Sequence, residues 1–361
     1  MRHAVAGGPV TVPRAALFAA VCAALMACQA PRQQEEIAVF SGTTMGTTFT
    51  VKVAAALDPP RRAALAGDIA ATLESVDGAM STYRDDSELM RFNRQPADRA
   101  FVFTPATFGV LEQALAVTRA SDGAFDVAVG PLVNAWGFGP QDMAQAPDEE
   151  TLASLLERID ARVQLTLDPS RHQVTKARSD VFVDLSGIAK GYAVDRVAAA
   201  LTNRGVADFL VEVGGEMRAR GERPGGRHWR VGVERPIEVR GQAARILPLK
   251  NAALATSGDY RNYRELEGAR ISHIIDPRTG RPIGHRLASA SVVAEDCARA
   301  DAWATALMVL GPEEGLAAAE RHDIAALLLV RAQNGGFTER ASHAFERLLD
   351  AAHPNPTGEG P

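Results

Sequence analysis

The chain has 361 residues, of which 46% are hydrophobic, and a formal net charge of −5 at pH 7. This length and apolar content are enough for one large domain or two closely merged ones. A chain this acidic, without any basic run, is not a nucleic-acid-binding protein.

The N-terminus has the pattern of a lipoprotein signal. Arg2 and Arg14 precede an apolar stretch over residues 15–27, which is too short to span a bilayer comfortably. Leu25-Met-Ala-Cys28 then resembles a bacterial lipobox. We therefore expect residues 1–27 to be removed and Cys28 to carry a lipid that anchors the exported chain to the inner or outer membrane, facing the periplasm. The alternative is an ordinary secretory peptide with an incidental cysteine.

Cysteine usage agrees with export but predicts no disulfide. Cys22 would leave with the signal and Cys28 would carry lipid, so only Cys297 remains in the folded part. Loss of the signal would also remove two arginines and no acidic residue, which changes the formal charge from −5 to −7. We expect residues 28–36 to be the lipidated cysteine and a tether, residues 37–350 the folded domain, and residues 351–361 a disordered tail.

The first half of the domain begins with two alternating strands, 37–41 and 47–53, around a glycine-bounded turn. Pro59-Pro60 breaks the second strand, and residues 63–80 have the pattern of an amphipathic helix. Capped helices are predicted to begin at Ser87, Thr104 and Asp148, and a hairpin at 163–167 and 173–176.

The central stretch runs from Val181 to Asp195. Residues 181–184 are expected to form a short buried strand, followed by a turn and a helix from Ile188. Backbone N–H groups converge at such a junction and bind anions. Lys190 lies in the first helical turn, where its charge opposes the helix dipole, so we expect a bound anion or Asp184 to compensate it.

The second half is predicted to be rich in strands, with helices that interrupt them irregularly. Strands are expected at 209–213, 229–234, 244–249, 252–256, 288–293 and, as the last core strand, 325–330; helices are expected at 297–310 and 313–321. This order favours an α+β fold over a regular βαβ arrangement.

Eight motifs, in this order, resemble the ApbE family of FAD:protein FMN transferases. They are Gly42-Thr-Thr-Met-Gly-Thr47, Met80-Ser-Thr-Tyr83, Gly123-Ala-Phe-Asp126 with Gly130-Pro131, Asp184-Leu-Ser-Gly-Ile-Ala-Lys-Gly-Tyr-Ala-Val-Asp195, Glu212-Val-Gly-Gly-Glu216, Ala255-Thr-Ser-Gly-Asp-Tyr260, His273-Ile-Ile-Asp-Pro-Arg-Thr-Gly280 and Asp301-Ala-Trp-Ala-Thr305. The resemblance implies a single merged body with an ApbE-like (T-fold-like) arrangement of mixed or antiparallel sheets and flanking helices.

The resemblance also implies an Mg²⁺-dependent reaction on FAD. A threonine or serine hydroxyl of an acceptor protein would attack the phosphate of the FMN half, and AMP would leave. Transfer of this type needs a metal at the pyrophosphate, a base for the hydroxyl and accurate positioning.

Asp301 and Thr305 are the candidate metal ligands. They are four residues apart on a predicted helix, so both side chains lie on one face and offer the hard oxygens that Mg²⁺ prefers. The resemblance adds the backbone carbonyl of Gly187. The alternative is that Asp301 only complements the helix dipole and Thr305 is an ordinary helix residue.

The resemblance makes His273 the general base, and imidazole suits this role because it titrates near neutral pH. Asp301 is the alternative base. The implied FAD contacts are Met45, Tyr83, Ala124, Phe125, Asp126, Asp184, Lys190 and Ile275. Ordinary core packing is the alternative for Met45 and Phe125. No G-x-G-x-x-G follows a strand, so a Rossmann unit is not the route to FAD.

Three functions remain open. The first is covalent flavinylation of acceptors, which by resemblance include subunits of ion-pumping NADH:quinone or Rnf-type complexes and membrane reductases. The second is an FAD pyrophosphatase, in which water replaces the acceptor hydroxyl. The third is a non-enzymatic flavin-binding lipoprotein, which would not need the metal pair or His273.

Overall fold

The computed structural model describes residues 36–139, 145–237, 241–260, 263–266, 269–333 and 335–352. The expected signal peptide, Cys28 and almost all of the tether lie outside the described residues, as does the expected tail from residue 353. The chain from Ile37 onward forms one compact unit. No helix of the described ranges is long and apolar enough to cross a membrane.

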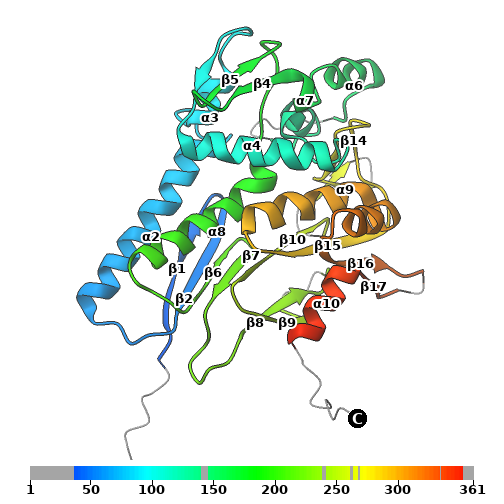
Figure 1. The fold of residues 1–361 in the computed structure, drawn as a ribbon. Coiled ribbons are helices and arrows are strands. Elements are labelled where there is room, and N and C mark those ends of the chain that lie inside the picture. Colours follow the sequence, from blue (N-terminus) through cyan, green and yellow to red (C-terminus); the bar gives the residue numbers. More distant parts are fainter. Residues whose placement is uncertain are drawn as a thin grey trace, which may run out of the picture. The chain divides into compact units, whose positions relative to one another are not determined.

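An eight-stranded sheet organises this unit (Figure 1). Its strands, in spatial order, are β1 (Ala38–Thr44), β2 (Thr47–Val53), β6 (Phe209–Val213), β7 (Glu216–Arg220), β10 (Ala252–Gly258), β15 (Leu287–Ala294), β16 (Ala325–Arg331) and β17 (Phe337–Ala341). Every neighbouring pair is antiparallel. The predicted α+β class is confirmed.

Helices cover one face of the sheet, and a hairpin with a helix covers the other (Figure 1). The first face packs against α8 (Ser186–Asn203) and α9 (Cys297–Arg321), with a core that includes Val211, Ala255 and Val292. The second packs against β8 (Trp229–Glu234), β9 (Ala243–Leu249) and α10 (His343–Ala352). Successive strand residues point to opposite faces, so one strand contributes to both cores.

The remaining elements surround the helical face. They are α2 (Pro59–Met80), α3 (Glu88–Asn93), α4 (Pro105–Ala120), the 3-10 turn η1 (Val127–Val129), α5 (Gly130–Ala135), α6 (Glu149–Leu156), α7 (Ala161–Gln164), and the short strands β3 (Phe101–Val102), β4 (Leu165–Asp168), β5 (Gln173–Lys176), β11 (Tyr263–Leu266), β12 (Ala269–Ser272), β13 (Ile275–Asp276) and β14 (Arg281–Pro282). Ser87, Thr104 and Asp148 cap their helices as predicted, each accepting a backbone N–H with its side chain. The helix after Pro59 begins at that residue rather than at Ala63, because proline is favourable in the first helical turn.

One predicted strand is wrong. Residues 181–184 form no strand, because the side-chain amide of Asn93 takes the place of a neighbouring strand: its Nδ2 donates to the carbonyl of Val183 and its Oδ1 accepts the Val183 N–H, both at 2.8 Å. The strand expected at 325–330 is confirmed as β16, and it is the last core strand, because none of the residues of the edge strand β17 is buried. The two helices expected at 297–310 and 313–321 meet as α9, with a kink at Gly311 (φ 79°).

Candidate functional site

The first part of the site is the two-residue turn between β1 and β2. Met45 and Gly46 have φ angles of 47° and 70°, as a type I′ hairpin requires. Residues 43–49 of this hairpin and the neighbouring part of α2, including Leu73 and Asp77, line a hollow of about 780 Å³. Met45 therefore lies beside a space large enough for a ligand, although it also packs against the main core.

The second part is the segment that leads into α8. Lys176 is only 1% exposed, and its ammonium group donates to the carbonyls of Asn93, Ser179 and Val181 at 2.8–3.2 Å. Burial lowers the pKa of Lys176. At the end of the segment, the Asp184 carboxylate accepts the N–H of Ser186 at 2.8 Å. Buried polar contacts thus fix the backbone that presents Asp184 and the start of α8.

A buried cluster of charges follows one turn along α8. Nζ of Lys190 lies 3.6 Å from Oε1 of Glu216 and 3.8 Å from Oδ1 of Asp301. Glu216 and Asp301 are 3% and 1% exposed, and the Gly191 N–H donates to the other oxygen of Asp301 at 3.0 Å. Within the described residues, Glu216 and Asp301, rather than the predicted Asp184, compensate the charge of Lys190.

The pKa values in this cluster follow from burial and from opposite charges. Burial raises the pKa of both Glu216 and Asp301, and the nearby Lys190 charge partly opposes this. Burial disfavours the charged form of Lys190, but Asp301 and Glu216 outweigh it and raise the pKa of the ammonium group. One carboxylate oxygen of Glu216, Oε2, is buried without a hydrogen-bond partner.

Thr305 and Gly187 come together beside this cluster. A Cβ atom on Gly187 would lie 3.4 Å from Oγ1 of Thr305 and only 3.0 Å from the ring of Phe125, so glycine allows the start of α8 to approach α9 closely. Asp301 is one helical turn before Thr305 on α9. Oγ of Ser257, on β10, lies 3.2 Å from Oγ1 of Thr305.

These residues fit Mg²⁺. Asp301, Thr305 and the Gly187 carbonyl would offer a small set of hard oxygen ligands, and Mg²⁺ usually completes its shell with waters and substrate phosphate oxygens. In the part of the chain that the structure describes, no group of three or more His, Cys, Asp or Glu residues is arranged to hold a metal ion. A metal site built from the described residues would therefore contain few carboxylates.

Tyr83 and His273 both contact Phe138. The Tyr83 hydroxyl donates to the carbonyl of Phe138 at 3.1 Å, and the rings of Phe138 and His273 meet edge to face, 6.3 Å between centroids. Tyr83 is 69% exposed, which leaves its ring available for stacking. Partial burial and the charge of Asp184 raise the pKa of its hydroxyl, which places Asp184 close by.

The remaining predicted contacts are buried. Ala124 and Phe125 are 1% and 4% exposed, and Ile275 packs in a small separate core with Leu132. The Asp126 carboxylate accepts the backbone N–H groups of Ala128 and Ala161, and burial raises the pKa of Asp126 to about 6. Its side chain thus has a structural use, and its contact with FAD remains a prediction.

Sequence reasoning assigned no role in this site to Asn93, Lys176 and Glu216, and it gave Ser257 no contact with Thr305. Glu216 and Ser257 lie inside quoted motifs, but their spacing alone does not show that they face Lys190 and Thr305. Asn93 and Lys176 belong to no motif. A buried lysine or asparagine has no signature in a single sequence, because its burial depends on distant segments.

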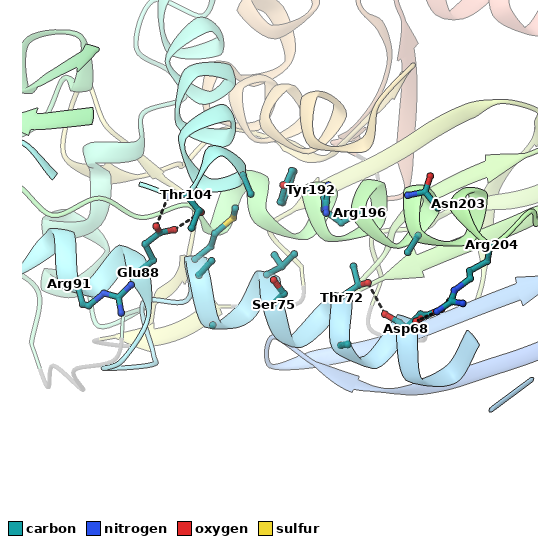
Figure 2. Close-up of a pocket in the computed structure, with 17 residues that line it drawn as sticks. Asp68, Thr72, Ser75, Glu88, Arg91, Thr104, Tyr192, Arg196, Asn203 and Arg204 are labelled. Atoms are coloured by element: carbon teal, nitrogen blue, oxygen red, sulfur yellow. Dashed lines mark hydrogen bonds and ion pairs between the residues drawn. The ribbon is translucent and has the colours of Figure 1, made fainter. Parts of the chain in front are cut away.

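A second hollow lies away from these residues. Figure 2 shows a groove of about 710 Å³ lined by residues of α2 and α8. At one end the Asp68 carboxylate pairs with Arg204, and at the other Glu88 accepts hydrogen bonds from Thr104. None of the predicted site residues lines this groove, so we assign it no chemistry.

Proteins similar to this chain in sequence and in structure are flavin transferases. The sequence matches the ApbE family over residues 45–328. It is 40% identical to an FAD:protein FMN transferase of Vibrio cholerae over 90% of this chain and 96% of the relative, and 36% identical to one of Escherichia coli over 94% and 98%. Two solved structures are similar: the flavin transferase ApbE from Vibrio cholerae (TM-score 0.78, 40% identity, 86% of this chain and 99% of that chain) and the apo flavinyl transferase ApbE from Pseudomonas stutzeri (TM-score 0.79, 40% identity, 87% and 96%).

Proposed function

The chain belongs to the ApbE family, and on this premise we propose that it is an FAD:protein FMN transferase that moves the FMN moiety of FAD to a threonine or serine hydroxyl of acceptor proteins, with release of AMP. The observation that carries the proposal is the convergence of Gly187, Lys190, Asp301 and Thr305 on two packed helices.

The metal is part of this proposal. Asp301, Thr305 and the carbonyl of Gly187 would hold Mg²⁺, which when bound would neutralise pyrophosphate charge and polarise the phosphorus. The buried setting strengthens each of these electrostatic effects, because little water competes for the charges.

The protein's own groups would do the rest. Lys190 would bind phosphate oxygens with its ammonium group, which the buried carboxylates keep protonated. His273 would accept the proton of the acceptor hydroxyl. Tyr83, Met45 and Phe125 would contact the rings of FAD, with Tyr83 stacking from its exposed position.

The acceptor decides between transfer and hydrolysis. Water in place of the acceptor hydroxyl would give FMN and AMP at the same site. The exposed ring of Tyr83 favours retention of FAD, since a stacked flavin leaves less room for water at the phosphate. The acceptors we propose are flavoproteins such as subunits of ion-pumping NADH:quinone or Rnf-type complexes and membrane reductases.

We further propose that the chain is exported and held at the membrane by a lipid on Cys28. The apolar stretch 15–27 and the lipobox-like sequence support this. In a bacterial host fed labelled palmitate, the unaltered chain and a Cys22→Ser control should carry the label, whereas Cys28→Ser should carry none. Label on Cys28→Ser, or no label on the unaltered chain, would contradict the lipid anchor.

The function is tested by mixing residues 29–361 with FAD, Mg²⁺ and a purified acceptor domain that carries an Asp-x-x-Thr-Gly-Ala-Thr site. A fluorescent acceptor band on a denaturing gel, matched by AMP, is the expected result. AMP and free FMN without a band would indicate the pyrophosphatase, and bound FAD with neither product would indicate a flavin carrier.

A further inference from the structure

Thr305 differs from three other helical threonines of this protein in the partner of its hydroxyl. Thr72, Thr118 and Thr202 each donate their hydroxyl proton to the carbonyl four residues earlier, at 2.7–3.0 Å. Within the described residues Thr305 makes no such bond, and its hydroxyl instead meets Oγ of Ser257 at 3.2 Å. The hydroxyl of Thr305 is thus directed across the helix–sheet interface rather than back along its own helix.

Ser257 occupies the helical face of β10. Ala253 and Ala255, the two preceding residues on that face, are buried in the core beneath the helices. Ser257 is only half-buried and continues this row toward the site. Its neighbour Thr256 points to the opposite face, where its hydroxyl pairs with Ser291 at 2.8 Å. The two adjacent hydroxyls therefore serve different sides of the sheet.

If Thr305 binds the metal ion, its hydroxyl must be the donor and Ser257 the acceptor in the hydrogen bond between them. A threonine hydroxyl that offers a lone pair to a cation must direct its proton elsewhere, since the cation repels it. Ser257 is the acceptor that the described structure provides for it. Ser257 then retains its own proton, for which the described residues offer no second acceptor, while a pyrophosphate at the site would offer one.

We propose that Ser257 is a positioning residue for Thr305 and a direct donor to the substrate pyrophosphate. This inference rests on the proposed function, because it takes Thr305 as a ligand of Mg²⁺. Ser257 would accept the Thr305 hydroxyl proton, which aims the lone pairs of Thr305 at the metal, and would donate its own proton to a phosphate oxygen of FAD. Removal of a side chain that is hydrogen-bonded to a metal ligand commonly lowers the metal affinity of the site by roughly 10–100-fold.

The test measures Mn²⁺ binding to the full chain by electron paramagnetic resonance, first with the metal alone and then with FAD present. We expect Ser257→Ala to weaken Mn²⁺ binding about tenfold, and to raise the KM for FAD more than it lowers kcat. Ser257→Thr keeps the hydroxyl and should bind Mn²⁺ within about threefold of the unaltered chain. Ser257→Cys has nearly the shape of serine, but its thiol is a poor hydrogen-bond acceptor, so it should weaken Mn²⁺ binding as Ser257→Ala does. It replaces Ser257→Ala in the test if the alanine variant does not fold.

Ser291→Ala is the matched control, because it removes a hydroxyl one strand away on the other face of the sheet. It should leave Mn²⁺ binding unchanged. Equal Mn²⁺ affinity for Ser257→Ala, Ser257→Cys and the unaltered chain would overturn the inference. Asp301→Asn distinguishes an error in the role of Ser257 from an error in the proposed metal site. If Asp301→Asn loses Mn²⁺ binding while the Ser257 variants retain it, only the role of Ser257 is wrong. If Asp301→Asn also retains Mn²⁺ binding, the proposed metal site is wrong as well.

Discussion

The side-chain amide of Asn93 pairs with the backbone of Val183 as a strand would, through two hydrogen bonds of 2.8 Å. Asn93 is 7% exposed and Val183 is fully buried. This contact joins α3 to a segment ninety positions later, one residue before Asp184. It therefore couples the stability of the fold to the geometry of the site.

Replacement of Asn93 by leucine should destabilise the protein and weaken FAD binding. The change leaves a buried N–H and a buried carbonyl without partners, which costs about 2–4 kcal/mol of unfolding free energy. Urea denaturation followed by tryptophan fluorescence measures this, and FAD titration measures the second effect. Gln95→Leu is the control, because Gln95 donates only to exposed loop carbonyls and should change stability by about 0.5 kcal/mol or less.

Lys190 and Glu216 should show strong energetic coupling. Lys190→Met leaves two buried carboxylates facing each other, whereas the double variant Lys190→Met, Glu216→Gln removes one of those charges. We expect the coupling energy in a double-mutant cycle to be about 1–3 kcal/mol. The surface pair Arg340 and Glu313 should give less than about 1 kcal/mol. A coupling for Lys190 and Glu216 no larger than that surface value would mean that the cluster is more hydrated than its burial indicates.

Asp301 should be essential for turnover but not for folding. Asp301→Asn keeps the shape of the side chain and removes the charge that would hold Mg²⁺. The rate of AMP release should therefore fall at least about a hundredfold, which is the effect of losing one strong electrostatic contact to the transition state. Chelation of the unaltered chain with EDTA should stop AMP release, and added Mg²⁺ should restore it. Retained turnover in Asp301→Asn would contradict the assignment of Asp301 as a ligand.

Much of the fold was predictable because local signals agree with it. A short apolar run located the strand at 209–213 to the residue, the strand at 229–234 was also predicted to the residue, and Ser87, Thr104 and Asp148 marked helix starts through their capping chemistry.

The segment at 181–184 shows a feature that local sequence signals cannot predict, namely the partner of a strand-like segment. Its alternating burial is that of a strand, but hydrogen-bonded partners cannot be read from hydrophobicity, and the partner here is a side chain far away in sequence. The contacts of Glu216 with Lys190 and of Ser257 with Thr305 could not be predicted for the same reason. Each acquires its place only when β7 and β10 pack against the helices that carry Lys190 and Thr305.

Asp126 should make stability depend on pH with an unusual sign. Burial raises the pKa of the folded-state carboxyl from the usual 3.8 to about 6, against the opposing effect of the Ala128 and Ala161 N–H donors. Below pH 3.8 both folded and unfolded chains are protonated at this residue. As the pH rises toward 6 the unfolded chain loses its proton first, so the free energy of unfolding falls, by at most about 3 kcal/mol.

The Asp126→Asn variant isolates this effect, because the amide oxygen can still accept both N–H groups but carries no charge at any pH. Urea denaturation at pH 4 and pH 7 should show that the unaltered chain loses stability relative to Asp126→Asn as the pH rises. Asp148→Asn is the control: hydrogen bonds from Thr151 lower the pKa of the exposed Asp148 carboxyl, so its effect on stability changes mainly below pH 4, and the unaltered chain should keep nearly the same stability relative to this variant at pH 4 and pH 7. If the difference between Asp126→Asn and the unaltered chain were the same at both pH values, the Asp126 carboxyl would have its ordinary pKa, and water would have to reach it in solution.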